Sequence, residues 1–258
     1  MEKPLYHILW PGGNTTALVV KKFTKNKHVK IAKQILSKHG NVEQVGFLEK
    51  PKNSKTDICL QMMGGEFCGN AARAAAFLEA MKNNKKSLRL EVSGFPKILD
   101  ATINGSKVTL TLPGSFFVRM ENKKEQSREI QIVDLMGIRF ILKNSAKSIS
   151  EAEKLIKKYK NGCPAVGVIY LSKKGNKIVI DPVVWVKKTN TCYNETACGS
   201  GSIAAAIAQF KLTQTKKSFL IIQPSEVTYA VTVIGSKNRI NKIKFQGPVK
   251  HLGPCTEV

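Results

Sequence analysis

Several features that mark other protein classes are missing from this sequence of 258 residues. No run approaches the roughly 18 apolar residues that would cross a membrane. The start, MEKPLYHILWPGGN, has no basic region followed by an apolar stretch and a cleavage site. The six cysteines include no CxxC pair and are too sparse for a disulfide scaffold. We therefore expect a soluble, cytoplasmic protein with reduced thiols and no membrane partner.

Recognisable cofactor motifs are also missing. The sequence has no pyridoxal-binding lysine motif, no nicotinamide fingerprint and no cluster with metal-ligand spacing, so we expect neither a cofactor nor a metal. Acidic residues are few: 18 stand against 42 Lys and Arg, which gives a net charge of +24. The cations are mostly lysines, spread in pairs along the chain without interleaved aromatics. This favours a solvated lysine surface over specific nucleic-acid binding, although weak binding at low salt is expected.

Two cysteines occupy matching positions in the sequence. EFCGNAARAAAFLEAM (residues 66–81) and ETACGSGSIAAAIAQF (residues 195–210) both place Cys-Gly and a polar residue before an alanine-rich stretch, and Cys198 follows Cys68 by 130 residues. The stretches predict helices over about 70–82 and 200–210. Because these helices have almost no polar face, we expect strands to enclose them.

Further landmarks repeat at the same distance from each cysteine. Gly105-Ser106-Lys107 and Gly235-Ser236-Lys237 both begin 37 residues after their cysteine. The sequence predicts an α+β fold made of two similar domains that arose by internal duplication, residues 1–118 and 119–258, whose last strand can return to the first half. The polar stretch RMENKKEQSR (residues 119–128) has the composition of a linker or exposed loop. Further helices are expected over 27–39 and 150–160, and strands over 17–23, 44–49, 56–62, 88–92, 108–112, 129–134, 138–142, 166–171, 177–186, 219–223 and 240–245.

The position of the two cysteines indicates chemistry. A thiol at a helix N-terminus meets the positive end of the helix dipole and unpaired N–H groups, which favour the thiolate and lower its pKa. One thiolate can remove an α-proton from an amino acid while the other thiol returns a proton on the opposite face, and helix N–H groups hold the α-carboxylate. This predicts racemisation. A single cysteine is commonly a buried structural thiol, but this alternative fits a matched pair poorly. The turn-and-helix context is missing at the other cysteines, Cys59, Cys163, Cys192 and Cys255.

These motifs resemble the diaminopimelate epimerase family of cofactor-independent racemases and epimerases. Gly12-Gly13-Asn14 is similar to the Gly-Asn loop of that family, Cys68-Gly69-Asn70 to its first catalytic motif, and residues 197–201 (ACGSG) to its second. The resemblance covers most of the chain. It implies catalytic Cys68 and Cys198, two domains that are each a mostly antiparallel, barrel-like unit around a central helix, and a homodimer.

One departure from the family concerns the substrate. Diaminopimelate epimerases carry a Glu-Arg pair before the second cysteine, where this chain has Thr189-Asn190, or Asn190-Thr191 if one residue is missing nearby. Segments 42–47, 65–70, 92–94 and 223–224 look like the histidine racemase branch. Glu43 then becomes the candidate partner for an imidazole N–H, and the alternative is a solvated carboxylate at a strand end. Glu195 is expected to add negative potential.

The leading hypothesis is therefore a histidine racemase whose partner is a small-molecule amino acid. The alternatives are a diaminopimelate epimerase or broad-specificity racemase and, in another class, a basic nucleic-acid-associated protein. The resemblance implies that substrate amino and carboxylate groups meet two kinds of residue. Side chains that orient the substrate are expected at Asn14, Gln44 and Asn70, and backbone N–H groups that receive the α-carboxylate at Gly69, Asn70, Gly199 and Ser200.

Overall fold

The structure, a computed structural model, describes residues 4–125, 128–211, 213–236 and 239–253. Its contacts divide the chain into unit 1, residues 1–110 with 246–258, and unit 2, residues 111–245. The chain leaves unit 1 within strand β7 (Lys107–Pro113) and returns within strand β16 (Arg239–Pro248). The domain boundary expected after residue 118 falls inside unit 2. Cys255 and Lys237, the last residue of the second Gly-Ser-Lys landmark, lie outside the described residues.

Unit 1 contains helices α1 (Lys25–Lys38) and α2 (Gly69–Asn83) among its described residues. Helix α1 connects the parallel pair β2–β3, and helix α2 connects the parallel pair β4–β5. The pairs β1–β2, β3–β4, β5–β6 and β1–β17 are antiparallel. The bounds are β1 Tyr6–Trp10, β2 Thr16–Val19, β3 Gln44–Glu49, β4 Ile58–Met62, β5 Ser87–Val92, β6 Phe95–Asn104 and β17 Lys250–Gly253.

Unit 2 repeats this order of pairings in its described residues. Helix α3 (Ile149–Tyr159) connects the parallel pair β10–β11, and helix α4 (Gly199–Gln209) lies between the parallel strands β12 and β14. The pairs β8–β9, β9–β10, β11–β12, β12–β13 and β14–β15 are antiparallel. The bounds are η1 Gly114–Phe116, β8 Phe117–Glu125, β9 Arg128–Leu135, β10 Ile138–Lys143, β11 Ala165–Lys174, β12 Lys177–Val186, β13 Thr191–Asn194, β14 Lys216–Ile222 and β15 Thr228–Ser236.

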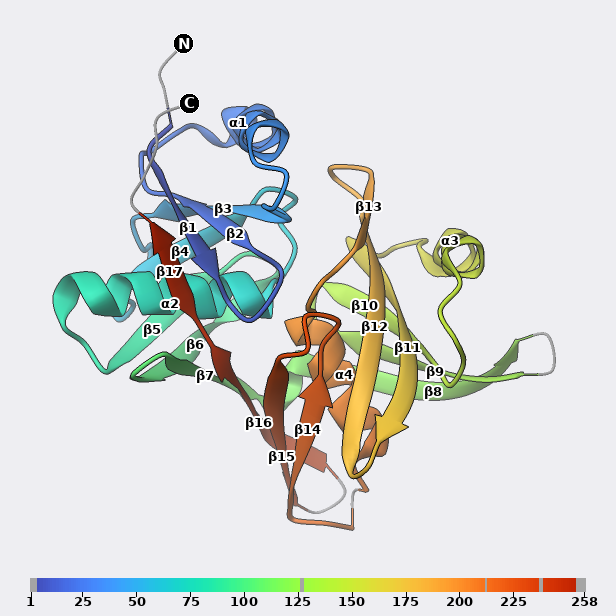
Figure 1. The fold of residues 1–258 in the computed structure, drawn as a ribbon. Helices are drawn as coiled ribbons and strands as arrows, with labels where there is room; N and C mark the ends of the chain where they lie inside the picture. The colour runs from blue at the N-terminus through green and yellow to red at the C-terminus, as the bar shows by residue number, and fades with distance from the viewer. Residues whose placement is uncertain (1–3, 126–127, 212, 237–238, 254–258) are drawn as a thin grey trace. The chain divides into compact units, whose positions relative to one another are not determined.

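The fold is α+β, as the sequence predicts, and the described strands form one mixed sheet of 17 strands. Each parallel pair needs a crossover longer than a hairpin turn, and helices supply it. Figure 1 shows α2 and α4 each lying among the strands of their own unit. In unit 1, α2 contacts β2, β4, β5 and β6. In unit 2, α4 contacts β9, β10, β11, β12, β14 and β15.

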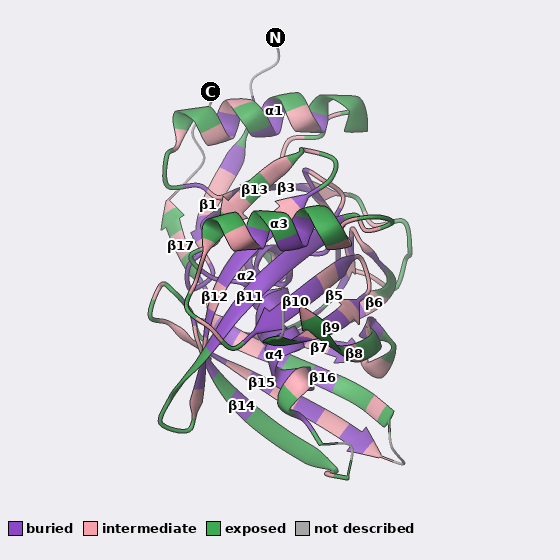
Figure 2. Ribbon diagram, turned by 90° about the vertical axis from the view of Figure 1, so that its right-hand side faces the viewer, coloured by how far each residue is buried: buried purple, intermediate pink, exposed green. Residues whose placement is uncertain are grey.

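The two alanine-rich helices are enclosed, as predicted. Ala71, Ala72, Ala74, Ala75 and Ala76 of α2 have no exposed surface, and Ala204, Ala205 and Ala206 of α4 have none either. Small side chains allow strands to approach a helix closely on several sides. Helices α1 and α3 differ, because each buries only one face and so carries alternating buried and exposed bands in Figure 2.

The prediction of a linker over residues 119–128 is wrong for the described part of that stretch. Strand β8 runs to Glu125 and pairs in antiparallel register with β9, from Phe117 opposite Leu135 to Glu125 opposite Arg128. Most β8 side chains are exposed on both faces, so the strand lacks the alternating apolar pattern that identifies a half-buried strand. Backbone pairing with β9 forms the strand, which composition alone could not predict.

Candidate functional site

In unit 1, Cys68 is the N-cap of helix α2. Its backbone is extended (φ −128°, ψ 111°), and its Sγ accepts a hydrogen bond from the backbone N–H of Ala71 at 3.4 Å. Serine, threonine and asparagine usually hold this position, where a side-chain acceptor satisfies one of the unpaired N–H groups of the first turn. Placing a thiol there sets a reactive group against helix N–H donors, and the Cys68 thiol is only partly buried.

A short chain of hydrogen bonds fixes the surroundings of Cys68. The thiol donates to Oε1 of Gln44 at 3.1 Å, and Nε2 of Gln44 donates to Oγ1 of Thr16 at 2.9 Å. The Thr16 hydroxyl in turn donates to the Asn14 carbonyl oxygen at 3.0 Å. Because Thr16 uses its hydrogen on Asn14, it can only accept from Gln44, so the amide oxygen of Gln44 faces the thiol. This arrangement suits a protonated Cys68.

The Gly-Asn loop of unit 1 has an unusual backbone. Gly12, Gly13 and Asn14 have φ values of 88°, 104° and 53°, so three consecutive residues lie at positive φ. Glycine adopts this region without steric cost, and asparagine is among the few other residues that tolerate it. The loop buries Asn14, which is 2% exposed, between β1 and β2.

In unit 2, Cys198 is the N-cap of helix α4, with nearly the same backbone angles as Cys68 (φ −128°, ψ 107°). Its Sγ accepts from the backbone N–H of Gly201 at 3.3 Å and lies 3.7 Å from Oγ of Ser200. The backbone N–H of Cys198 donates to Oε1 of Gln223 at 2.9 Å, and Nε2 of Gln223 donates to Oγ of Ser202 at 3.0 Å. Gln223 therefore holds the start of α4 against the end of β14.

The prediction that the helix dipole lowers the thiol pKa is wrong for Cys198. Burial raises the pKa of this thiol well above its ordinary value, and the Glu195 carboxylate raises it further by its charge and by accepting a hydrogen bond. Hydrogen bonds from Gly201 and Ser200 act in the opposite direction and are weaker. Desolvation of a thiolate thus outweighs the helix dipole here. The raised pKa favours the protonated form of Cys198.

The structure brings most of the predicted residues together within their own units. In unit 1, the hydrogen bonds above link Cys68 to Gln44 and, through Thr16, to Asn14, and Gly69 and Asn70 follow Cys68 as the first residues of α2. Glu43 directly precedes β3, is partly exposed, and its backbone N–H donates to the Thr15 carbonyl at 2.9 Å. In unit 2, the residues grouped around the thiol are Glu195, Cys198, Gly199 and Ser200.

Sequence reasoning missed Thr16, Arg73, Ser202 and Gln223. Arg73 lies on α2 with no exposed surface, although its helix is otherwise mostly alanine and apolar residues. The available signal was a charged residue in the middle of the alanine run. Among the described cysteines outside the motifs, partial desolvation raises the pKa of the thiols of Cys59, Cys163 and Cys192.

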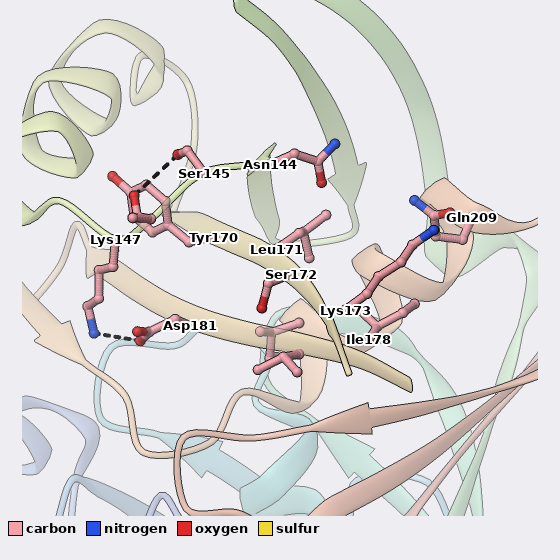
Figure 3. Close-up of a pocket in the computed structure, with 13 residues that line it drawn as sticks. Asn144, Ser145, Lys147, Tyr170, Leu171, Ser172, Lys173, Ile178, Asp181 and Gln209 are labelled. Carbon is pink, nitrogen blue, oxygen red and sulfur yellow. Dashed lines mark hydrogen bonds and ion pairs between the residues drawn. The ribbon is translucent and has the colours of Figure 1, made fainter. Parts of the chain in front are cut away.

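Unit 2 also has a cavity of about 630 Å³ that contains none of the predicted residues. Figure 3 shows Tyr170, Leu171 and Ile178 along its strands and the Lys147–Asp181 ion pair at one side, with an N–O distance of 2.6 Å. Within the described residues, no group of three or more His, Cys, Asp or Glu side chains could hold a metal ion. No helix in the described part of the chain is long and apolar enough to cross a membrane.

Solved structures of PhzF-family proteins have a similar architecture. A phenazine biosynthesis protein of the PhzF family from Enterococcus faecalis matches with a TM-score of 0.62 and 18% identity, over 100% of this chain and 99% of that chain. The PhzF-family protein of Bacillus anthracis matches with a TM-score of 0.69 and 14% identity, over 100% and 99%. At these identities the likeness establishes the fold: the chain has a PhzF-like fold.

The sequence pattern described as "Histidine racemase CntK N-terminal domain" matches residues 6–253, so the chain belongs to this family. Among curated relatives, a histidine racemase of Fusobacterium nucleatum subsp. nucleatum is 28% identical over 83% of this chain and 83% of its own length. A histidine racemase of Staphylococcus aureus is 22% identical over 93% of this chain and 90% of its own. The predicted resemblance to histidine racemases is confirmed.

Proposed function

We propose that this protein interconverts L- and D-histidine without an organic cofactor, with Cys68 and Cys198 as the two catalytic acid–base groups. The observation that carries the proposal is that each unit caps a buried helix with a cysteine, in a chain that belongs to a histidine racemase family. The enzyme class is accordingly an isomerase.

The proposed reaction moves two protons. The thiolate of one cysteine removes the α-proton and becomes a thiol. The electron pair left at the α-carbon delocalises into the carboxylate, and the other thiol then donates its proton to the opposite face and becomes a thiolate. The net change is inversion at one carbon, and the next turnover in the same direction needs a proton exchange with solvent. The proposal requires both thiols to meet the same α-carbon.

One thiolate must be present before substrate is turned over. Both thiols have acceptors that suit the protonated form, Gln44 beside Cys68 and Glu195 beside Cys198. Glu195 is a carboxylate and can itself take up a proton, whereas the amide of Gln44 cannot. We propose that Glu195 receives the proton of Cys198 when substrate binds. The charges of the substrate ammonium and carboxylate groups then change the electrostatic potential at the thiol.

The α-carboxylate requires donors that need no ordering during the reaction. Backbone N–H groups at the first positions of a helix have no partner inside the helix and feel the positive end of its dipole. In α2 the thiol caps Ala71, and the preceding positions are Gly69 and Asn70. In α4 it caps Gly201, and the preceding positions are Gly199 and Ser200. We propose these groups as the carboxylate-binding donors.

The substrate side chain follows from the residues near the second cysteine. Thr189, Asn190 and Thr191 supply neutral groups, and they bond among their own neighbours: the two threonine hydroxyls lie 2.6 Å apart, and Oδ1 of Asn190 accepts from Trp185 Nε1 at 3.2 Å. None of them matches the arginine that would grip a second carboxylate. A neutral or weakly cationic side chain is therefore favoured, and we propose that Glu43 accepts a hydrogen bond from the imidazole.

Three further properties belong to the same proposal. The repeated order of strand pairings and cysteine caps supports duplication of one barrel-like ancestral domain, whose two copies correspond to unit 1 and unit 2. The shared motifs support a relationship to the diaminopimelate epimerases.

We also propose a cytoplasmic homodimer that binds no nucleic acid specifically. If the basic surface served nucleic acid instead, binding would persist at moderate salt and racemisation would be absent.

The deciding experiment incubates the purified protein with each L-amino acid in deuterated water and follows α-deuterium by mass spectrometry. We expect rapid exchange and D-isomer formation with histidine, and much slower exchange with diaminopimelate when the two compete. Faster turnover of diaminopimelate would favour the alternative substrate, and no exchange with any amino acid would overturn the racemase proposal.

A second experiment tests whether the two thiols share one carbon. Mild oxidation should join Cys68 to Cys198 and abolish activity, and a thiol reductant should restore it. Peptide mapping of the oxidised protein should identify the crosslink. Retained activity, or irreversible loss without that crosslink, would contradict the shared site.

A further inference from the structure

Strand β10 of unit 2 ends earlier than the strand beside it. Its parallel pairing with β11 stops at Lys143, opposite Tyr170, whereas β11 continues to Lys174 and stays paired with β12 on its other side. Among the described residues, no strand pairs with β11 on the β10 side beyond Tyr170. Residues 171–174 therefore have an open strand edge, although β11 is an inner strand of the sheet.

The register shows which peptide groups point into this gap. In an antiparallel pair, alternate residues bond to the partner strand, and the residues between them point the other way. The Pro164 carbonyl, just before β11, accepts from the N–H of Lys187, just after β12, at 2.9 Å. Even-numbered residues of β11 therefore face β12, and the pairing continues without a register shift to Lys174. Lys173 thus directs its backbone N–H and C=O away from β12 and toward the gap.

Two cavities lie where β10 ends. One, of about 630 Å³, is lined mainly by residues of β11, β12 and the segment after β10, and the other, of about 450 Å³, mainly by residues of β8 and β9. Leu171 and Gln209 line both cavities. Figure 3 shows Ser172 and Lys173 following Leu171 along the first cavity. The open edge of β11 therefore faces space that a further extended segment can occupy.

The charges around the two cavities are mostly positive. Lys147 pairs with Asp181 at an N–O distance of 2.6 Å, which leaves three lysines against one glutamate. Lys173 is exposed and forms no ion pair with any described residue. A ligand that carries carboxylates complements this charge. The remaining charged residues of the two cavities are Lys123, Lys124, Lys173 and Glu129.

We propose that the open edge of β11, residues 171–174, binds an extended acidic segment of a partner protein, which adds a strand where β10 has ended. Main-chain hydrogen bonds to Lys173 hold the segment, and the lysines select its acidic side chains. Because side chains of an extended chain alternate in direction, every second one can face the cavity wall that contains the buried Leu171 and Ile178. This inference is independent of the racemase proposal.

The test selects peptides from a phage-displayed library of random heptapeptides on the whole protein. We expect the enriched peptides to alternate acidic and apolar residues, and their binding to weaken as salt is raised. Fluorescence polarisation of a fluorescein-labelled copy gives the dissociation constant. Methylation of alternate peptide nitrogens keeps the charge but removes main-chain donors, and should weaken binding about tenfold or more. Enrichment of neutral or basic peptides, or of none, would overturn the inference.

Amide exchange at single residues shows where the peptide binds. In ¹⁵N-labelled protein, the Lys173 N–H should exchange about tenfold or more slowly once the enriched peptide is bound, because it gains an acceptor. The Ser172 N–H already faces β12 and should not change. No protection at Lys173 would contradict strand addition. Protection in the free protein that disappears on dilution would show that a second copy covers this edge, and would also overturn the inference.

Charge-reversal variants test the acidic preference. Lys173→Glu and Lys124→Glu should each weaken peptide binding about 5- to 10-fold, because each replaces an attractive charge with a repulsive one. The control is Lys216→Glu, at an exposed position of β14 that lines neither cavity, which changes the net charge equally and should leave binding nearly unchanged. All three side chains are exposed, so the variants should fold. Equal weakening in all three would show a response to net charge alone and would refute the assigned site.

Discussion

The two units share the same cysteine-capped helix and the same order of strand pairings, but the groups around the two thiols differ. Both cap a buried alanine-rich helix with a cysteine, at φ −128° in each case, and both connect parallel strands through helices in the same order. The thiol of Cys68 is partly exposed and faces a neutral amide, whereas that of Cys198 is buried beside a carboxylate. In both units the fold places a thiol at the start of a helix. The groups next to each thiol determine whether it is protonated. Both acceptors suit a protonated thiol, but the Glu195 carboxylate can itself take up a proton and the Gln44 amide cannot.

The largest expected effect tests whether both units are needed. Cys68→Ser and Cys198→Ser should each reduce histidine racemisation by about 10³-fold or more, because a hydroxyl is far harder to deprotonate than a thiol. Serine is a favoured N-cap, so both helices should keep their first turn and the proteins should fold normally. Chiral chromatography of the histidine product measures the loss.

The matched control is Cys192→Ser, which changes an exposed cysteine on β13 and should leave the rate unchanged. Near-full activity in Cys198→Ser would show that one unit suffices and would remove the two-base mechanism.

The next effect tests the difference between the thiols. In Glu195→Gln the charge and the strong acceptor beside Cys198 are lost, and both of these raise the pKa of the thiol in the wild type. The pKa of Cys198 should therefore fall, so alkylation by iodoacetamide should begin at lower pH and the pH–rate profile should move in the same direction. Racemisation at neutral pH should fall about tenfold or more, since the acceptor for the Cys198 proton is gone.

Peptide-resolved mass spectrometry reports each cysteine separately in that experiment. Cys192 is the internal reference, because partial desolvation and the Glu153 charge, and not Glu195, raise the pKa of its thiol. An unchanged alkylation profile of Cys198 in Glu195→Gln would show that burial alone controls this thiol.

A smaller effect concerns unit 1, where the proposed imidazole partner lies. Glu43→Gln should lower kcat/KM for histidine about tenfold, because a neutral amide is a weaker acceptor for an imidazole N–H than a carboxylate. The melting temperature should change little, since Glu43 is partly exposed and lies just before β3. The control is Glu129→Gln, at an exposed position of β9. Unchanged histidine kinetics in Glu43→Gln would move side-chain recognition to another residue.

Local patterns were enough to predict the elements that carry the thiols. The Cys-Gly motifs and alanine runs predicted α2 and α4 to within a residue or two, and strand β3 matches its predicted bounds. Features set by distant contacts were not predictable. Strand β8 exists because β9 pairs with it, and Arg73 is buried because Pro11 and Pro248 approach it from far along the chain. The raised pKa of Cys198 likewise depends on burial that no local motif encodes.

The smallest effect distinguishes a structural helix cap from the two cysteine caps. Ser148 is the N-cap of α3 in unit 2, and its Oγ accepts from the backbone N–H of Glu151 at 3.4 Å. Ser148→Ala should lower the free energy of unfolding by about 0.5–1 kcal/mol, at the weak end for such caps because the bond is long. Racemisation should be unchanged, because this cap supplies no proton. Urea denaturation gives the stability change, with Ser150→Ala, at an exposed position inside the first turn, as the control. An equal loss in both variants would show that helix propensity, and not the cap, accounts for it. A fall in racemisation would show that α3, as well as α2 and α4, contributes to the reaction.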